Sequence, residues 1–230
     1  MTNRSALVLF GDVVGSRRDS VGSTAWLREL VAELDTAYGE ERVAPFGFTQ
    51  GDELQGLIEP AADPFVAVLH AALGPEGRRM RWVIVRGETD ADTTGGKAPA
   101  TEWTGPAFVT AREAIETART GHERLVILTG RPDVDALLAD LAPALVDLLD
   151  GLTSRQRIVA RLALIEDLRQ SEVADRLQVR RATISVSFSR ARVRSLQRLV
   201  AGIRRVYASA SGDSWRVATE SAGRDLSKEE

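Results

Sequence analysis

Apolar residues follow two different periods along the first 130 residues of the chain. Short runs such as ALVLF and WVIV are typical of buried strands. Trp26, Leu30 and Leu34 instead recur at the spacing of one helix face, behind a Ser23 or Thr24 cap. In chain order the pattern predicts strand, helix, two hairpin strands, helix, strand, helix and strand, over residues 5–15, 23–39, 42–50, 53–60, 63–74, 78–88, 105–119 and 124–130.

This order predicts an α+β fold for the N-terminal domain. The succession β-α-β-β-α-β is that of the ferredoxin-like fold, here extended by one helix and one strand. A polar stretch over 89–103 predicts a loop. From Leu152 onward only amphipathic helical segments occur, so we expect a second, all-α domain. The predicted units are 1–130, a helical connector over 131–151, the all-α domain over 152–207, and a polar tail over 208–230 whose Trp215 is a candidate for docking on the body.

Charge divides the chain in the same place. Residues 1–150 hold 14 basic and 24 acidic side chains, a net −10, whereas residues 151–207 hold 13 arginines and 4 acidic side chains, a net +9. A basic segment beside an acidic domain predicts two separate tasks on one chain.

Composition limits the chemistry that the chain can perform. It has no cysteine, which excludes disulfides, zinc–thiolate sites and cysteine nucleophiles. Its two histidines, His70 and His122, fall on different predicted elements. Any metal ion would therefore be held by carboxylates, which favours Mg²⁺ or Mn²⁺. The first apolar run is too short for a signal peptide or a membrane span, so we expect a cytoplasmic protein without a membrane partner.

Two acidic segments are the candidates for such a site. In TQGDELQGLI, Asp52 lies at a predicted hairpin turn, and in LFGDVVGS, Asp12 lies at the exit of the first strand. The two carboxylates would meet at one edge of the sheet as metal ligands, with nucleotide phosphates bridging to the ion. The alternative is structural, with Asp12 capping a turn or helix and Asp52 shaping the hairpin. The residues expected to bind the ligand are Gly11, Gly15, Ser16, Arg17, Gly51, Glu53 and Arg112.

These motifs resemble known families. FGDVVGS is similar to the metal-binding segment of class III nucleotidyl cyclases, and QGDELQGLI to their hairpin and to the G-G-D-E-F turn of diguanylate cyclases. The closer resemblance, over about residues 5–130, is to the SatD family, through FGDVVGSR, TQGDELQGLI and WTGPAFVTAREAIETA. It implies a nucleotidyl-cyclase-like fold and no settled reaction.

The departures from the cyclases favour ligand binding over catalysis. The purine-recognising lysine before the turn is replaced by PFGFTQ, and FVTARE lacks the asparagine partner of its arginine. Gln50 also stands where the diguanylate motif has its first glycine. Loss of charge-stabilising groups lowers catalytic rates by orders of magnitude.

The basic segment predicts a DNA-binding unit. Thr153 or Ser154 would cap a first helix, and the segments QSEVADRLQV and RRATISVSFSRARVRSLQRLV would form a short helix, a turn and one long helix. The spacing resembles the helix-turn-helix of sigma region-four and LuxR-type domains over about residues 152–200. The inward residues would be Ile158, Leu162, Ile165, Val173, Ala174, Leu177, Ile184 and Phe188.

In that arrangement the start of the third helix would enter the major groove of double-stranded DNA. The expected DNA-binding residues are Arg180, Arg181, Thr183, Ser185, Ser187, Arg190, Arg192 and Arg194. The alternative is a basic helix that packs on the acidic domain as an autoinhibitory or dimer contact. The sequence thus favours a homodimeric DNA-binding transcriptional regulator whose cyclase-like domain senses a ligand, with a nucleotide as the candidate, or dimerises. A metal-dependent nucleotidyl cyclase or nucleotidyltransferase with a DNA-binding module is the other hypothesis.

Overall fold

A five-stranded sheet organises the N-terminal part of the molecule. The computed structural model describes residues 4–16, 19–49, 52–90 and 96–210. The strand order is β2-β3-β1-β4-β5, in which β4 and β5 are parallel and the other neighbouring pairs are antiparallel. The strands are β1 (Arg4–Val13), β2 (Arg42–Phe48), β3 (Glu53–Ile58), β4 (Met80–Thr89) and β5 (Leu125–Leu128).

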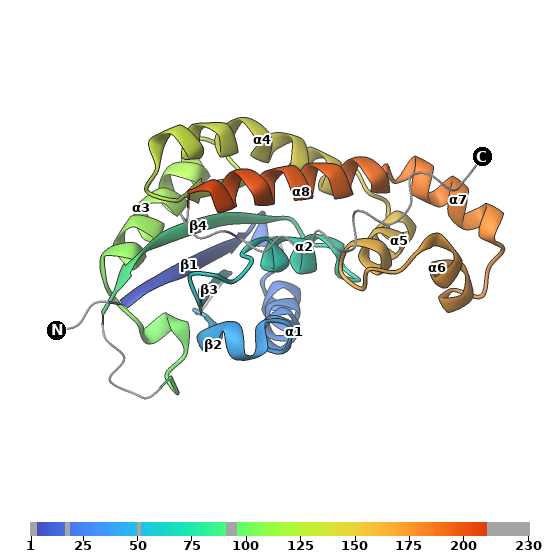
Figure 1. Ribbon diagram of the computed structural model, residues 1–230. Coiled ribbons are helices and arrows are strands. Elements are labelled where there is room, and N and C mark those ends of the chain that lie inside the picture. Colours follow the sequence, from blue (N-terminus) through green and yellow to red (C-terminus); the bar gives the residue numbers. More distant parts are fainter. Residues whose placement is uncertain (1–3, 17–18, 50–51, 91–95, 211–230) are drawn as a thin grey trace.

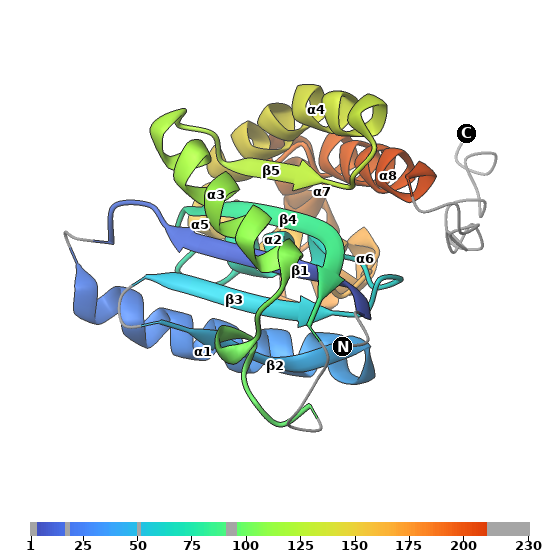
Figure 2. The same ribbon diagram turned by 90° about the vertical axis from the view of Figure 1, so that its left-hand side faces the viewer.

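Eight α-helices are described around and beyond this sheet. Figures 1 and 2 show α3 crossing one face of the sheet, with α1 and α2 on the other. The helices are α1 (Ser20–Tyr38), α2 (Phe65–Leu73), α3 (Pro106–Thr120), α4 (Pro132–Asp150), α5 (Ser154–Leu164), α6 (Gln170–Arg176), α7 (Arg181–Arg190) and α8 (Val193–Ser209). The fold is therefore of the mixed α+β class.

Side-chain alternation along β1 separates two apolar layers. Val8 and Phe10 pack in the cluster under α3, while Leu7 and Leu9 belong to the larger cluster that includes α1 and α2. A central strand that is buried on both faces needs apolar residues at nearly every position, and β1 has such a run. Pro45, which lacks a backbone donor, lies in the edge strand β2.

Helix ends follow the local chemistry of the chain. Pro106 and Pro132 begin α3 and α4, where a missing amide hydrogen costs no helical bond. Gly105, just before α3, has φ of 127°, and a Cβ there would lie 2.6 Å from the Asp90 amide nitrogen. Only glycine fits this close approach between the loop and the end of β4.

Four details differ from the sequence-based expectations. The cap of α1 is Asp19, whose Oδ1 accepts a hydrogen bond from the Gly22 amide at 3.0 Å, and not Ser23 or Thr24. Residues 100–102, expected in a loop, form a short 3₁₀ helix. Ile158 is 46% exposed, because the inward face of α5 is instead formed by Val159, Ala160, Leu162 and Ala163.

The fourth difference concerns the long basic helix predicted over 180–200. The structure divides it into α7 and α8 at Arg192, whose φ is 50°. A left-handed residue cannot continue an α-helix, so one helix ends before Arg192 and the next begins after it. Trp215 lies outside the described residues.

The C-terminal helices share one hydrophobic cluster with the sheet. Leu196, Val200 and Ile203 of α8 belong to the same buried cluster as Leu69 of α2. The Tyr207 ring meets Phe65 edge-on at 5.7 Å between centroids. Figure 1 shows α8 alongside α4 over the sheet. Helices α5 and α8 are thus packed against α2 and α4, whereas α6 and α7 pack on α5 and α8 beyond the sheet (Figure 1).

Glu33 links three of these elements by polar contacts. From α1, its Oε1 accepts a hydrogen bond from His70 Nδ1 of α2 at 2.7 Å and another from Arg161 Nη2 of α5. These hydrogen bonds lower the pKa of Glu33 from 4.5 to about 2, with the larger contribution from His70 and a smaller one from Arg161. Burial acts in the opposite direction and raises the pKa.

Replacing Glu33 by glutamine is therefore expected to destabilise the protein by about 1–2 kcal/mol near neutral pH. Because the folded-state pKa is depressed, the carboxylate stabilises the fold fully above pH 4.5 and loses this effect as the pH falls toward 2. Urea unfolding of wild type and Glu33→Gln across this range should show their stability difference shrinking with acidity. A difference that stays constant with pH would contradict this role.

Candidate functional site

The predicted acidic residues come from adjacent strands at one end of the sheet, but the side chains of Asp12 and Asp52 have different partners, and the structure does not bring these two carboxylates together. Asp12 on β1 is the cross-strand partner of Glu53 on β3, and the Val13 amide donates to the Asp52 carbonyl at 3.0 Å. The Ser16 hydroxyl donates to Asp52 Oδ2. Because cross-strand partners project on the same face, this pairing places Asp12 beside Glu53, whereas Asp52 is the neighbour of Val13. Gly51 and Arg17 lie outside the described residues.

Asp12 is buried and held by two arginines. Its side chain is 6% exposed; Oδ2 accepts from Arg81 Nη1 at 2.5 Å, and Oδ1 accepts from Arg119 Nη2 at 3.2 Å. Arg81 is also buried and donates from Nε to the Glu123 carbonyl at 3.0 Å. Charge-assisted bonds of this kind are the strong class of hydrogen bond. Asp12 therefore serves as the centre of an ion-pair cluster that joins β1, β4 and α3.

Sequence reasoning missed both arginines of this cluster. Arg81 interrupts the apolar strand segment RRMRWVIV, and the β1–β4 register pairs it directly with Asp12. A charged residue inside a buried strand was the available signal, because such a residue requires a partner on the same face. Arg119 carried no comparable signal, since it lies at the exposed end of an amphipathic helix.

The side chains around Asp12 are not arranged to bind a divalent cation. Both carboxylate oxygens already accept hydrogen bonds from arginine, and a cation would have to displace them. No group of three or more histidine, aspartate and glutamate side chains suited to a metal occurs within the described residues. Binding of Mg²⁺ or Mn²⁺ stays a prediction.

The other predicted ligand residues have identifiable structural surroundings. A Cβ at Gly11 would lie 2.6 Å from Met80 Cε, so Gly11 allows close packing on the face opposite Asp12. Gly15 has φ of 79° in the turn after β1. Arg112 lies over the Phe10 ring, with 6.0 Å between its guanidinium carbon and the ring centroid, about two helical turns from Arg119. Arg112 is therefore separate from the Asp12 cluster.

The C-terminal helices form a second candidate site. Thr153 caps α5 in a capping box with Gln156. A turn with Gln178 at φ of 53° joins α6 to α7. Val173, Ala174, Ile184 and Phe188 are buried, as the spacing predicted, and Leu177 packs against the same cluster.

The remaining face of α7 is polar and basic. Ser187 is half-buried, and its hydroxyl donates to the Thr183 carbonyl at 2.9 Å. Of the predicted DNA-binding residues on or next to α7, the exposed ones are Arg180, Arg181, Thr183, Ser185 and Arg190, and the apolar Val186 is also 50% exposed. Because α7 ends at Arg190 and α8 begins at Val193, the exposed Arg192 and Arg194 do not belong to α7, which corrects the predicted continuous basic helix.

Fold and sites together define a mixed α+β protein with a buried aspartate–arginine cluster at one sheet end and a basic helical face at its C-terminal side. A family model for the SatD family matches residues 6–197. The chain belongs to the SatD family. The match extends beyond the segment that carried the motifs and includes α5, α6 and α7. No curated protein matches the chain. No helix among the described residues has the length and apolar character to cross a membrane.

Proposed function

We propose that this protein is a DNA-binding transcriptional regulator whose N-terminal domain senses a ligand or dimerises. The observation that carries the proposal is the pair α6 and α7, which buries Val173, Ala174, Ile184 and Phe188 and leaves a basic, hydroxyl-rich face on α7 exposed. In helix-turn-helix proteins the second helix presents such a face to the major groove. Arginine there pairs with guanine edges, and serine and threonine bond bases or phosphates.

The N-terminal domain belongs to this proposal as a ferredoxin-like, cyclase-related unit. The strand order β4-β1-β3-β2, all antiparallel, supports the ferredoxin-like arrangement, with β5 added parallel to β4. Ligand sensing is preferred over nucleotidyl transfer because both Asp12 oxygens are engaged by arginines. Helix-turn-helix proteins commonly bind two-fold sites as dimers, so a homodimer completes the proposal.

The full chain is expected to bind double-stranded DNA with a steep dependence on salt. Arginines that neutralise phosphates release condensed counterions, so affinity should fall by about 100-fold or more between about 50 and 200 mM salt. Selection from random duplexes followed by fluorescence anisotropy on the selected and a scrambled site measures both affinity and specificity. Equal affinity for the two duplexes, or no binding at low salt, would contradict the proposed function.

A further inference from the structure

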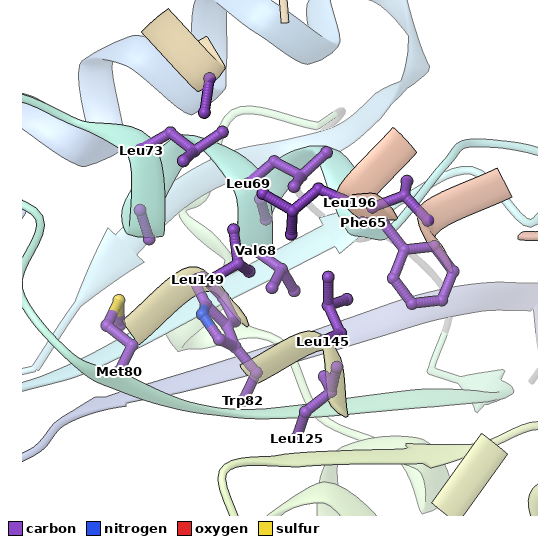
Figure 3. Close-up of a cluster of buried hydrophobic side chains, with 14 of the residues drawn as sticks. Phe65, Val68, Leu69, Leu73, Met80, Trp82, Leu125, Leu145, Leu149 and Leu196 are labelled. Atoms are coloured by element: carbon purple, nitrogen blue, oxygen red, sulfur yellow. The ribbon is translucent and has the colours of Figure 1, made fainter. Parts of the chain in front are cut away.

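A cavity of about 150 Å³ lies on the opposite face of the sheet from Asp12. It is bounded by β4, β5, α2, α4 and α5, at the point where the sheet meets the C-terminal helices. Figure 3 shows most of its apolar floor, to which four elements contribute. The floor is formed by Val68, Ala71, Met80, Trp82, Leu125 and Leu149. A cavity of this volume has room for a benzene-sized group.

The rim of the cavity is strongly basic. Among the described residues that line it, four are arginines and Asp150 is the single carboxylate. Two of the arginines have their donors engaged. Arg78 bonds Asp19, Glu76 and Ser23, and Arg124 bonds the Met80 carbonyl and both Asp150 oxygens.

The other two arginines retain free donors within the described part of the chain. Arg79 pairs only through Nε with Asp150, at 3.3 Å, and its side chain is 63% exposed at the mouth. Arg157 donates only to carbonyl oxygens: Nη1 to Glu76 and Gly77, at 3.0 and 3.1 Å, and Nε to Leu152 at 3.3 Å. Arg79 thus shares the Asp150 carboxylate with Arg124, and Arg157 pairs with no carboxylate within the described residues, beside an apolar floor.

Arg157 is also held in place before any ligand arrives. Gly77 has φ of 54°, and a Cβ there would lie 1.7 Å from Arg157 Nη1. The guanidinium group therefore lies directly on the Gly77 backbone, which fixes its plane. A preorganised donor loses less conformational entropy when it binds an anion.

We propose that this cavity binds a small organic acid that has one carboxylate and a compact apolar body of about the size of a phenyl ring. The apolar body occupies the floor beside Trp82, and the carboxylate accepts hydrogen bonds from Arg79 and Arg157. Charge complementarity excludes a cationic ligand, and the apolar floor disfavours a bare inorganic anion. This proposal is independent of DNA binding.

Isothermal titration of the full chain with sodium benzoate, at constant ionic strength, tests the site. We expect a dissociation constant of about 1 mM or tighter. Benzamide, a neutral compound of the same shape, should bind at least about tenfold more weakly, because charge-assisted hydrogen bonds are lost. Equal binding of the two compounds, or no binding of benzoate at about 10 mM, would overturn the proposal.

Three variants place the binding in this cavity. Arg79→Gln should weaken benzoate binding about tenfold, whereas the control Arg131→Gln, an exposed arginine paired with Asp133 elsewhere, should not. Ala72→Leu places a larger side chain on the cavity wall and should abolish binding with the fold retained, as checked by thermal melting. Benzoate affinity unchanged in Arg79→Gln or in folded Ala72→Leu would show that the acid binds elsewhere.

Discussion

Replacing Arg81 with methionine is expected to lower the free energy of unfolding by about 3 kcal/mol or more. The substitution leaves the buried Asp12 carboxylate without its shorter ion pair and leaves the Glu123 carbonyl without a donor. Removing one partner from a buried ion pair costs about 3–5 kcal/mol, because the other charge stays desolvated. Urea unfolding should show a lower midpoint with an unchanged m-value, and the melting temperature should fall by about 6–12 °C.

Arg119→Met is the matched control for this experiment. Arg119 bonds the same carboxylate, but its side chain is 42% exposed, so its loss should cost about 1 kcal/mol or less. The double variant Asp12→Asn with Arg81→Met should recover part of the lost stability, since the buried charge is then absent. If Arg81→Met were no more damaging than Arg119→Met, the ion-pair cluster would not be the structural centre of this sheet end.

Reversing the charge of Arg181 should weaken DNA binding by about 100-fold or more. Glutamate at the first position of α7 removes a base or phosphate contact and places a like charge against the DNA backbone. In a dimer the substitution acts at both half-sites. Fluorescence anisotropy at low salt measures the loss, and circular dichroism melting verifies that the variant remains folded.

Arg205→Glu provides the same change of charge at another place. Arg205 is exposed near the end of α8, about 20 Å along that helix from Arg192, and should lie away from the DNA. Its substitution is expected to reduce affinity by no more than a few fold, through long-range electrostatics. Equal losses in the two variants would indicate binding through overall charge, and no loss in either would place the DNA contact outside α7.

The local pattern of the sequence predicted most elements because their determinants are local. The apolar run of β1, the proline at the start of α3 and the Thr153 cap each act within one turn or strand. The spacing of apolar residues alone was enough to predict which faces of α6 and α7 are buried. Pairing of Asp12 with the hairpin was also predictable, since it needs only the topology of the sheet.

Other features depend on contacts between distant segments and were missed for that reason. The partnership of Arg81 with Asp12 requires the β1–β4 register, and the links from Glu33 to His70 and Arg161 join residues far apart in the chain. The break at Arg192 occurs in a sequence without glycine or proline, so no local signal marked it. The exposure of Ile158 likewise depends on which face of α5 meets α2, and helical spacing does not decide this.

The short connection between α4 and α5 has a mechanical consequence. Only Gly151, Leu152 and Thr153 separate the two helices, and Leu152 is buried in the shared cluster. The helices proposed to bind DNA, α6 and α7, are thus joined to the rest of the molecule through α5 and α8, which pack on α2 and α4. Under the proposed function, a change caused by a ligand in the N-terminal domain would reach α7 through these packed helices. In the proposed homodimer, such a change would alter the spacing between the two α7 helices, because no long linker within the described residues lets one of them move alone.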